Sequence, residues 1–232
     1  MVYTMFDYTW FIFMVPCMIL SLYCSAKVHS TFNKYSQVRN RRGLTGAQAA
    51  QNVLYSNGVT GVTIEKVAGN LTDHFDPRTN TIRLSESVYD SSSVAAVGVA
   101  AHEAGHAVQH ATNYVPNKIR SAVVPAAKFG SSLSWILITI GLFLPVQYDF
   151  VVIAGIVLFS FSVIFTLVTL PVEFNASKRA LQTIKGSSLL DEAEFTGAKK
   201  TLSAAAMTYV AAAATSIASL LRLLLIVNNR RR

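Results

Sequence analysis

The chain has 232 residues, of which 52% are hydrophobic and only 14% are charged. A soluble domain carries about a quarter charged residues, so this composition argues against an ordinary soluble enzyme and against disorder. The net charge of +8 leaves nucleic acid or a membrane surface as partners until the positions of the charges are considered.

The first predicted element is an apolar helix over residues 6–26, whose one charged residue is Asp7. Three further apolar blocks lie at residues 129–146, 150–171 and 202–227. A helix needs about 20 apolar residues to cross the hydrocarbon layer of a membrane. A buried core helix would explain one such block but explains four poorly. We therefore predict four transmembrane helices.

The first block also resembles a secretory signal peptide in its position, but it lacks a basic start. Its positive flank comes afterwards, from Lys27 to Arg42. This order indicates a retained anchor whose following loop lies in the cytoplasm. Cys17 and Cys24 lie within the block, and we interpret them as small apolar residues of the helix rather than as a disulfide framework.

Residues 27–128 are predicted to form a small α+β region outside the membrane. Thr45 and Gln48 fit a capping box at the start of a helix, and Asn57-Gly58 ends that helix. A short strand-like stretch follows between Val62 and Val67. These signals place one helix and one strand before the next turn.

A β-hairpin is predicted over residues 72–84, because turn residues from Asp76 to Asn80 separate two strand-like runs. The hairpin is either purely structural or provides an edge along which an extended substrate pairs. After it, Asp90 and Ser91–Ser93 offer an N-cap to a long helix that runs through Ala111.

The long helix contains the sequence His102-Glu103-Ala104-Gly105-His106. Residues four apart share one face of a helix, so both imidazoles can reach one metal ion. Glu103 stands beside the first histidine and can accept a proton from a metal-bound water. Chance alone predicts about 0.003 such patterns in a chain of this composition. The alternative is a surface helix with two solvated histidines.

A catalytic zinc needs a third protein ligand. The candidates are His74, His110, Glu173, Asp191, Glu192 and Glu194. The backbone of His110 lies about 12 Å from that of His102 along a helix, too far for one metal ion. The three acids at 191–194 are interpreted as a solvated helix start. Glu173 is the preferred ligand because of its position in the chain.

Glu173 follows the apolar block that ends at Pro171 and is predicted to open a new helical run over residues 174–184. Two membrane crossings separate it from His106, so both lie on the same side. An uncompensated carboxylate at the membrane edge is costly, which favours a paired or metal-bound Glu173. A charged residue that merely anchors the helix end is the alternative.

The basic residues also predict the topology. Lys and Arg are frequent in residues 27–128 and 172–201 and absent from residues 147–149, which places the first two regions in the cytoplasm. Because the bases flank apolar blocks and form no aromatic-interleaved stripe, nucleic acid is not a predicted partner. Arg230–Arg232 are the exception: either this basic tail lies outside or the last helix does not cross.

The chain resembles the YugP-type family of membrane zinc metallopeptidases, also called neutral zinc metallopeptidases. The resemblance rests on the segments 75–79, 84–85, 98–110 and 171–177. A more distant likeness is to HtpX-type membrane proteases, which pair HExxH with a downstream Glu-Phe-x-Ala-Asp. Here Ser177 stands in place of that aspartate, where it offers a weaker acceptor to a ligand histidine.

The resemblance and the residue chemistry together predict a mainly α integral membrane protein with four transmembrane helices and a small zincin-like (gluzincin) catalytic domain. One Zn²⁺ per chain is held by His102, His106 and Glu173, with Glu103 as general base. Region 27–128 carries the HExxH helix, and 172–201 carries the third ligand. Two His and one carboxylate also suit non-haem iron, but the HExxH spacing favours zinc.

The predicted activity is that of an endopeptidase of the cell membrane whose partners are the lipid bilayer and a membrane or unfolded protein substrate. Two other functions fit the same residues. One is a zinc hydrolase with a non-peptide substrate, and the other is a non-catalytic membrane scaffold with a structural metal. His74, Tyr114 and Arg179 are the candidate donors to the oxyanion that peptide hydrolysis would form.

Overall fold

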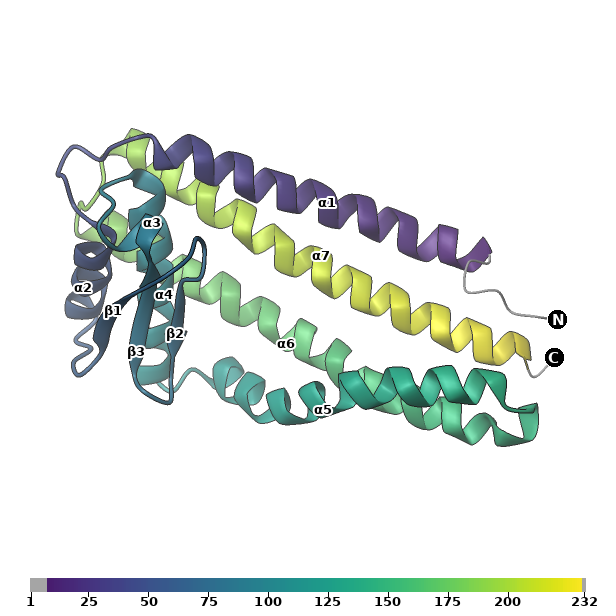
Figure 1. Ribbon diagram of the computed structural model, residues 1–232. Coiled ribbons are helices and arrows are strands. Elements are labelled where there is room, and N and C mark those ends of the chain that lie inside the picture. Colours follow the sequence, from purple (N-terminus) through teal and green to yellow (C-terminus); the bar gives the residue numbers. More distant parts are fainter. Residues whose placement is uncertain (1–7, 231–232) are drawn as a thin grey trace. The chain divides into compact units, whose positions relative to one another are not determined.

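The computed structural model describes residues 8–230 (Figure 1). The chain is mainly helical, with one three-stranded sheet. The helices are α1 (Tyr8–Ser36), α2 (Gly46–Ser56), α3 (Glu86–Tyr89), α4 (Val94–Ala111), α5 (Val115–Phe143), α6 (Asp149–Gly186) and α7 (Glu192–Arg230), with a 3-10 turn at Val146–Tyr148. The strands are β1 (Thr63–Val67), β2 (His74–Asp76) and β3 (Thr81–Ser85).

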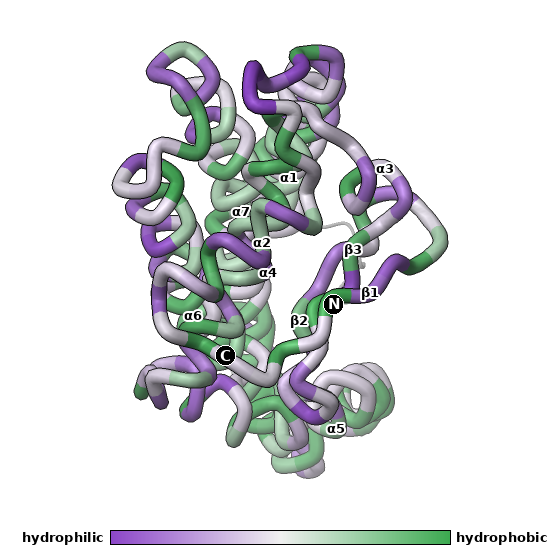
Figure 2. Tube along the Cα trace, turned by 90° about the vertical axis from the view of Figure 1, so that its left-hand side faces the viewer, coloured by the Kyte–Doolittle hydropathy of each residue, from purple (hydrophilic) through white to green (hydrophobic). Residues whose placement is uncertain are grey.

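Four of these helices, α1, α5, α6 and α7, are long and apolar enough to cross a membrane. Many of their large hydrophobic side chains are exposed, among them Phe11, Leu22, Phe129, Phe150 and Leu221. Figure 2 shows hydrophobic stretches along the helices and hydrophilic residues in several connecting loops. Exposed apolar side chains of this density are typical of a surface that meets lipid.

The chain divides into two compact units, and the first contains most of the apolar helix length. In this unit α5 and α6 form a close helical hairpin. A methyl group added at Gly155 would lie 2.7 Å from the Ile138 side chain, and one at Gly141 would lie 2.8 Å from the Val152 backbone nitrogen. Small residues therefore let the two backbones approach, as in many membrane helix pairs.

Arg230, at the end of α7, is bonded to the turn of this hairpin. Its guanidinium lies 3.5 Å from the buried carboxylate of Asp149 and donates to the carbonyls of Gly141 and Leu144. The basic residue that departs from the predicted charge bias is therefore paired with a buried acid rather than left as a free charge. Arg231 and Arg232 lie outside the described residues.

Helix α6 corrects one sequence-based expectation. Glu173 does not open a new helix, because α6 runs without a break from Asp149 to Gly186 with Pro171 inside it. Proline removes one backbone hydrogen bond, but long membrane helices tolerate it where neighbouring groups satisfy the freed carbonyl. Glu173 consequently projects from inside a continuous helix and not from the start of a new one.

The second unit comprises residues 24–117 and 172–207 and contains the sheet. The strand order is β1-β3-β2, with β1 parallel and β2 antiparallel to β3. The β2–β3 pairing confirms the predicted hairpin. Strand β3 is buried along most of its length because it is central, whereas β1 and β2 form the two edges.

Helix α4 lies in the core of this unit, where Val97, Ala101 and Ala104 are fully buried. Ser93 caps its start by accepting a hydrogen bond from the backbone of Ala96, as predicted. The predicted capping box at Thr45 is also present at the start of α2. These caps satisfy backbone donors that have no partner inside the helix.

The start of α7 corrects a second expectation. Glu194 is not solvated: only 8% of it is exposed. Its carboxylate accepts hydrogen bonds from the backbone nitrogens of Asp191 and Arg41, at 2.9 and 2.7 Å. Asp191 in turn accepts from the backbone of Glu194, which completes a capping box. This acid therefore has a structural role, joining α7 to the loop after α1.

Candidate metal centre

Three side chains from two helices converge at one point in the second unit. The Nε2 atoms of His102 and His106, one turn apart on α4, lie 3.1 Å from each other. The Oε2 atom of Glu173 on α6 lies 3.3 Å from the first and 3.4 Å from the second. A tetrahedral ion with bonds of about 2 Å separates its ligand atoms by about 3.3 Å, so the three atoms fit such an ion.

The hydrogen bonds of Gln109 fix which nitrogen of His106 carries its proton. The Gln109 amide nitrogen donates to the carbonyl of Val172 and to Oδ1 of Asn175, at 2.8 and 3.0 Å. Its oxygen therefore faces Nδ1 of His106, at 3.1 Å, and must accept a hydrogen bond from it. Neutral His106 consequently presents a lone pair on Nε2, toward the other two side chains.

His102 is oriented by a second contact, since its Nδ1 lies 3.0 Å from the hydroxyl of Ser177. Ser177 thus occupies the position in which the sequence predicts an acceptor for a ligand histidine. With Nδ1–H donated to this hydroxyl, Nε2 of His102 also points a lone pair at Glu173. Three electron-pair donors facing one another repel unless a cation or a proton lies between them, which suits a metal site.

Helices α4 and α6 approach closely beside this centre. A methyl group added at Gly105 would lie 2.5 Å from the carbonyl oxygen of Ala176. Only glycine leaves room for this contact, which brings the α4 histidines within reach of Glu173 on α6. The glycine inside the motif therefore has a packing role that spacing alone does not reveal.

Gln109 and Asn175 are site residues to which the sequence analysis assigns no role. Gln109 is fully buried, and Asn175 accepts a second hydrogen bond, at 2.8 Å, from Nε of Arg179. The guanidinium of Arg179 also lies over the ring of Tyr114, 5.7 Å from its centroid. Its position three residues after His106, on the helix face of the two motif histidines, is the sequence signal that could have identified Gln109.

Charges around the centre favour an ionised Glu173. Burial of its carboxyl opposes ionisation, but when no ion is bound and the two histidines are protonated, their hydrogen bonds and charge outweigh burial and hold the pKa of Glu173 well below its ordinary value. Burial raises the pKa of Asp73, against two hydrogen bonds donated by Ser85, and the charge of Glu103 adds to that rise. Glu103 is itself buried and lies outside the group of three converging side chains.

The remaining candidates lie apart from the three ligand atoms. His110 is exposed and stacks near the ring of Phe75, at 5.8 Å between centroids. His74 is exposed on β2, where its Nδ1 bonds the carbonyl of Thr72 at 2.8 Å. Asp191 and Glu194 serve the cap of α7, Glu192 pairs with Lys185, and Arg179 and Tyr114 contact each other. The structure thus groups only Glu173 with the two motif histidines.

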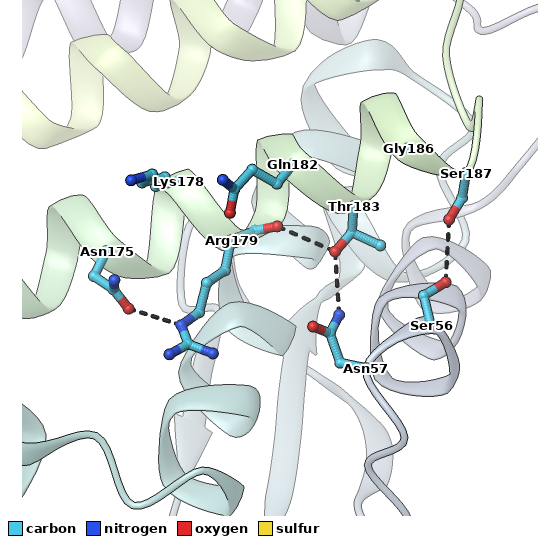
Figure 3. A pocket seen from close by; sticks show the side chains of 9 residues that line it. All are labelled: Ser56, Asn57, Asn175, Lys178, Arg179, Gln182, Thr183, Gly186 and Ser187. Atoms are coloured by element: carbon cyan, nitrogen blue, oxygen red, sulfur yellow. Dashed lines mark hydrogen bonds between the residues drawn. The ribbon is translucent and has the colours of Figure 1, made fainter.

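A polar cavity of about 440 Å³ lies along the neighbouring face of α6 (Figure 3). Asn175 and Arg179 line it, and Thr183 accepts a hydrogen bond from Asn57 of the α2 end at 3.1 Å. Asn175 belongs both to this cavity and to the Gln109 network. The metal centre is therefore connected to the cavity through hydrogen-bonded side chains.

Comparison with known proteins assigns the family. The family model described as "putative neutral zinc metallopeptidase" matches residues 10–228. The chain belongs to this family. It is also 44% identical over 222 residues to "Putative membrane protease YugP" of Bacillus subtilis (strain 168), an alignment covering 95% of this chain and 98% of that protein. No solved structure matches the chain.

Proposed function

We propose that the chain is an integral-membrane zinc endopeptidase with one zinc ion held by His102, His106 and Glu173. The observation that carries this proposal is the convergence of two imidazole nitrogens and a carboxylate oxygen within 3.1–3.4 Å of one another. The family assignment supports zinc as the ion. Three protein ligands leave a fourth position for water or substrate, as in catalytic zinc sites.

When bound, zinc lowers the pKa of a water molecule toward neutrality and polarises the scissile carbonyl. Glu103 then serves as general base: its carboxylate takes the proton of the attacking water and returns it to the leaving amine. Its place beside His102 in the sequence of α4 supports this role, and its burial shields the carboxylate from bulk water. Gln109 and Ser177 hold the two imidazoles in orientation throughout.

The substrate is an extended segment of a membrane or unfolded protein. Strand β2 forms an edge of the sheet and contacts α4, so a substrate strand added beside β2 would run near the metal centre. Asp73 anchors the start of this edge through the backbone and hydroxyl of Ser85, at 2.8 and 3.1 Å. These contacts support a zincin-like (gluzincin) arrangement of edge strand, HExxH helix and third-ligand helix.

The location we propose is the cell membrane, with the metal centre on the cytoplasmic side. The basic residues of segments 27–128 and 172–201 support this orientation through the positive-inside bias. Both segments contribute ligands, and the two apolar blocks between them return the chain to the same side. The relative's description as a membrane protease supports the membrane part of this proposal.

The test is a set of single substitutions in the purified full-length protein. Glu103→Gln should retain one zinc per chain and lose hydrolysis of an unfolded protein substrate, with the rate falling by about 100-fold or more. Glu173→Ala should lose zinc, and His110→Ala, on the same helix as the histidines, is the control that should keep both. Hydrolysis that survives Glu103→Gln, or full zinc content in Glu173→Ala, would refute the assignment.

A further inference from the structure

A second cavity lies between α6 and α7, on the part of each helix that belongs to the second unit. It measures about 740 Å³ and is mostly apolar, with a few polar side chains and three lysines. Its lining includes Phe174, Leu181, Leu202, Ala206 and Met207. These five side chains make no described contact with the metal centre, whereas Ser177, which also lines the groove, is bonded to His102.

The charged residues of this α6–α7 groove all have the same sign. Lys178, Lys185 and Lys199 line it and are exposed, and no acidic residue does. Lys185 pairs with Glu192 at 4.0 Å, whereas Lys178 and Lys199 have no carboxylate partner within the described part of the chain. Figure 3 shows Lys178 pointing away from Arg179, whose guanidinium is bound to Asn175. Lys178 and Lys199 are therefore available to an anion.

The groove begins next to the apolar stretches of both helices. Phe174 lies about 4.5 Å of helix rise beyond Pro171, where the apolar block of α6 ends. Met207 is the last residue of the second unit on α7. Lys178 lies about 10 Å of helix rise beyond Pro171, and Lys199 lies about 4.5 Å before Leu202, where the apolar block of α7 begins. Long lysine side chains can extend back toward the membrane.

We propose that the α6–α7 groove binds one anionic phospholipid of the cytoplasmic leaflet. One acyl chain lies on Phe174, Leu202 and Met207, and the phosphate is held by Lys178 and Lys199. The polarity of the groove matches the orientation of a leaflet lipid, with the chain toward the membrane and the headgroup toward the cytoplasm. Basic pockets between membrane helices on this side bind anionic headgroups in the same way.

The experiment measures lipid binding to the full-length protein in detergent by native mass spectrometry. The probes are phosphatidylglycerol, phosphatidylcholine with matched acyl chains, and glycerol phosphate without chains. Wild type should bind one phosphatidylglycerol and discriminate against phosphatidylcholine. Lys178→Gln/Lys199→Gln should weaken phosphatidylglycerol binding by about 30-fold. Lys27→Gln/Lys200→Gln removes equal charge outside the groove and should change binding less than about twofold.

A second variant tests the apolar half of the groove. Ser203→Trp places a large ring among the lining residues, and it should abolish tight lipid binding while circular dichroism confirms a folded protein. Equal binding of the two phospholipids, equal weakening by the control pair, or competition by glycerol phosphate alone would overturn the proposal. So would groove variants that impair peptide cleavage and leave lipid binding intact, because the groove would then hold substrate.

Lipid binding and peptide cleavage can be lost independently of each other, so separate measurements test the two proposals. Lipid binding needs membrane insertion but no zinc, so it should persist in Glu173→Ala. A protein that binds phosphatidylglycerol and cleaves no peptide would refute only the peptidase. A protein that cleaves peptides and shows no preference for phosphatidylglycerol would refute only the lipid site.

Discussion

At the scale of single residues, the centre depends on side chains that are not metal ligands. Gln109 is bonded to His106, Val172 and Asn175, so one buried amide orients an imidazole and joins α4 to α6. Metal-bound histidines usually donate their second N–H to such an acceptor, and loss of the acceptor weakens metal binding.

Gln109→Leu should therefore lower zinc affinity by about 10- to 100-fold. The substitution removes the acceptor of the His106 proton while leaving an uncharged side chain of similar size. Competition with a zinc chelator measures the change, and Gln182→Leu, an exposed amide on α6, is the matched control. A Gln109→Leu protein with wild-type zinc affinity would show that His106 needs no such partner.

At the scale of elements, the site depends on the separation of α4 and α6. The two backbones are close at Gly105, where an added methyl would lie 2.5 Å from the Ala176 carbonyl oxygen. At Gly98, on the same helix, an added methyl would lie 3.4 Å from Ala198, which is ordinary contact. The two glycines therefore provide a matched pair for testing this close approach.

Gly105→Ala should destabilise the protein by about 1–3 kcal/mol, because the helices must separate or the backbone must shift. Zinc content should fall in the same variant, since Glu173 moves away from the α4 histidines. Thermal unfolding in detergent and metal analysis measure the two effects. Gly98→Ala should change both very little, and equal effects of the two substitutions would contradict a specific α4–α6 contact at Gly105.

At the scale of the whole molecule, the contacts of α7 bear on which ends of the helices share a side of the membrane. The contacts of Arg230 with Gly141 and Asp149 place the end of α7 beside the α5–α6 turn. With the basic segments in the cytoplasm, this turn and the end of α7 should both lie outside, and the last helix should cross fully.

Cysteine labelling of whole cells tests this topology. In a background of Cys17→Ala and Cys24→Ala, Gln147→Cys and Asn228→Cys should react with a membrane-impermeant maleimide on intact cells. Gln51→Cys, on α2, should react only after the cells are permeabilised. Protection of Asn228→Cys on intact cells would mean that α7 does not cross, and labelling of Gln51→Cys would place the metal centre outside.

The elements with strong local signals were predictable from sequence. The capping residues Thr45 and Ser93, the turn chemistry after Asp76 and the apolar blocks all act over a few neighbouring residues. The structure corrects two expectations, the helix boundary before Glu173 and the exposure of Glu194. Both depend on what packs around the residue and not on its neighbours in the sequence. Pro171 usually ends a helix in water, and Glu194 usually faces solvent, but packing overrides both preferences.

The sequence by itself determined the four apolar helices and the HExxH pair, because hydropathy and the helical repeat depend only on residue order. Only the tertiary structure decided that Glu173 lies 3.3 Å from His102 and that Gln109, Ser177 and Gly105 support this pairing. These contacts join residues more than 60 positions apart or depend on how two helices pack. Their distances follow from side-chain packing between α4 and α6, which no local pattern encodes.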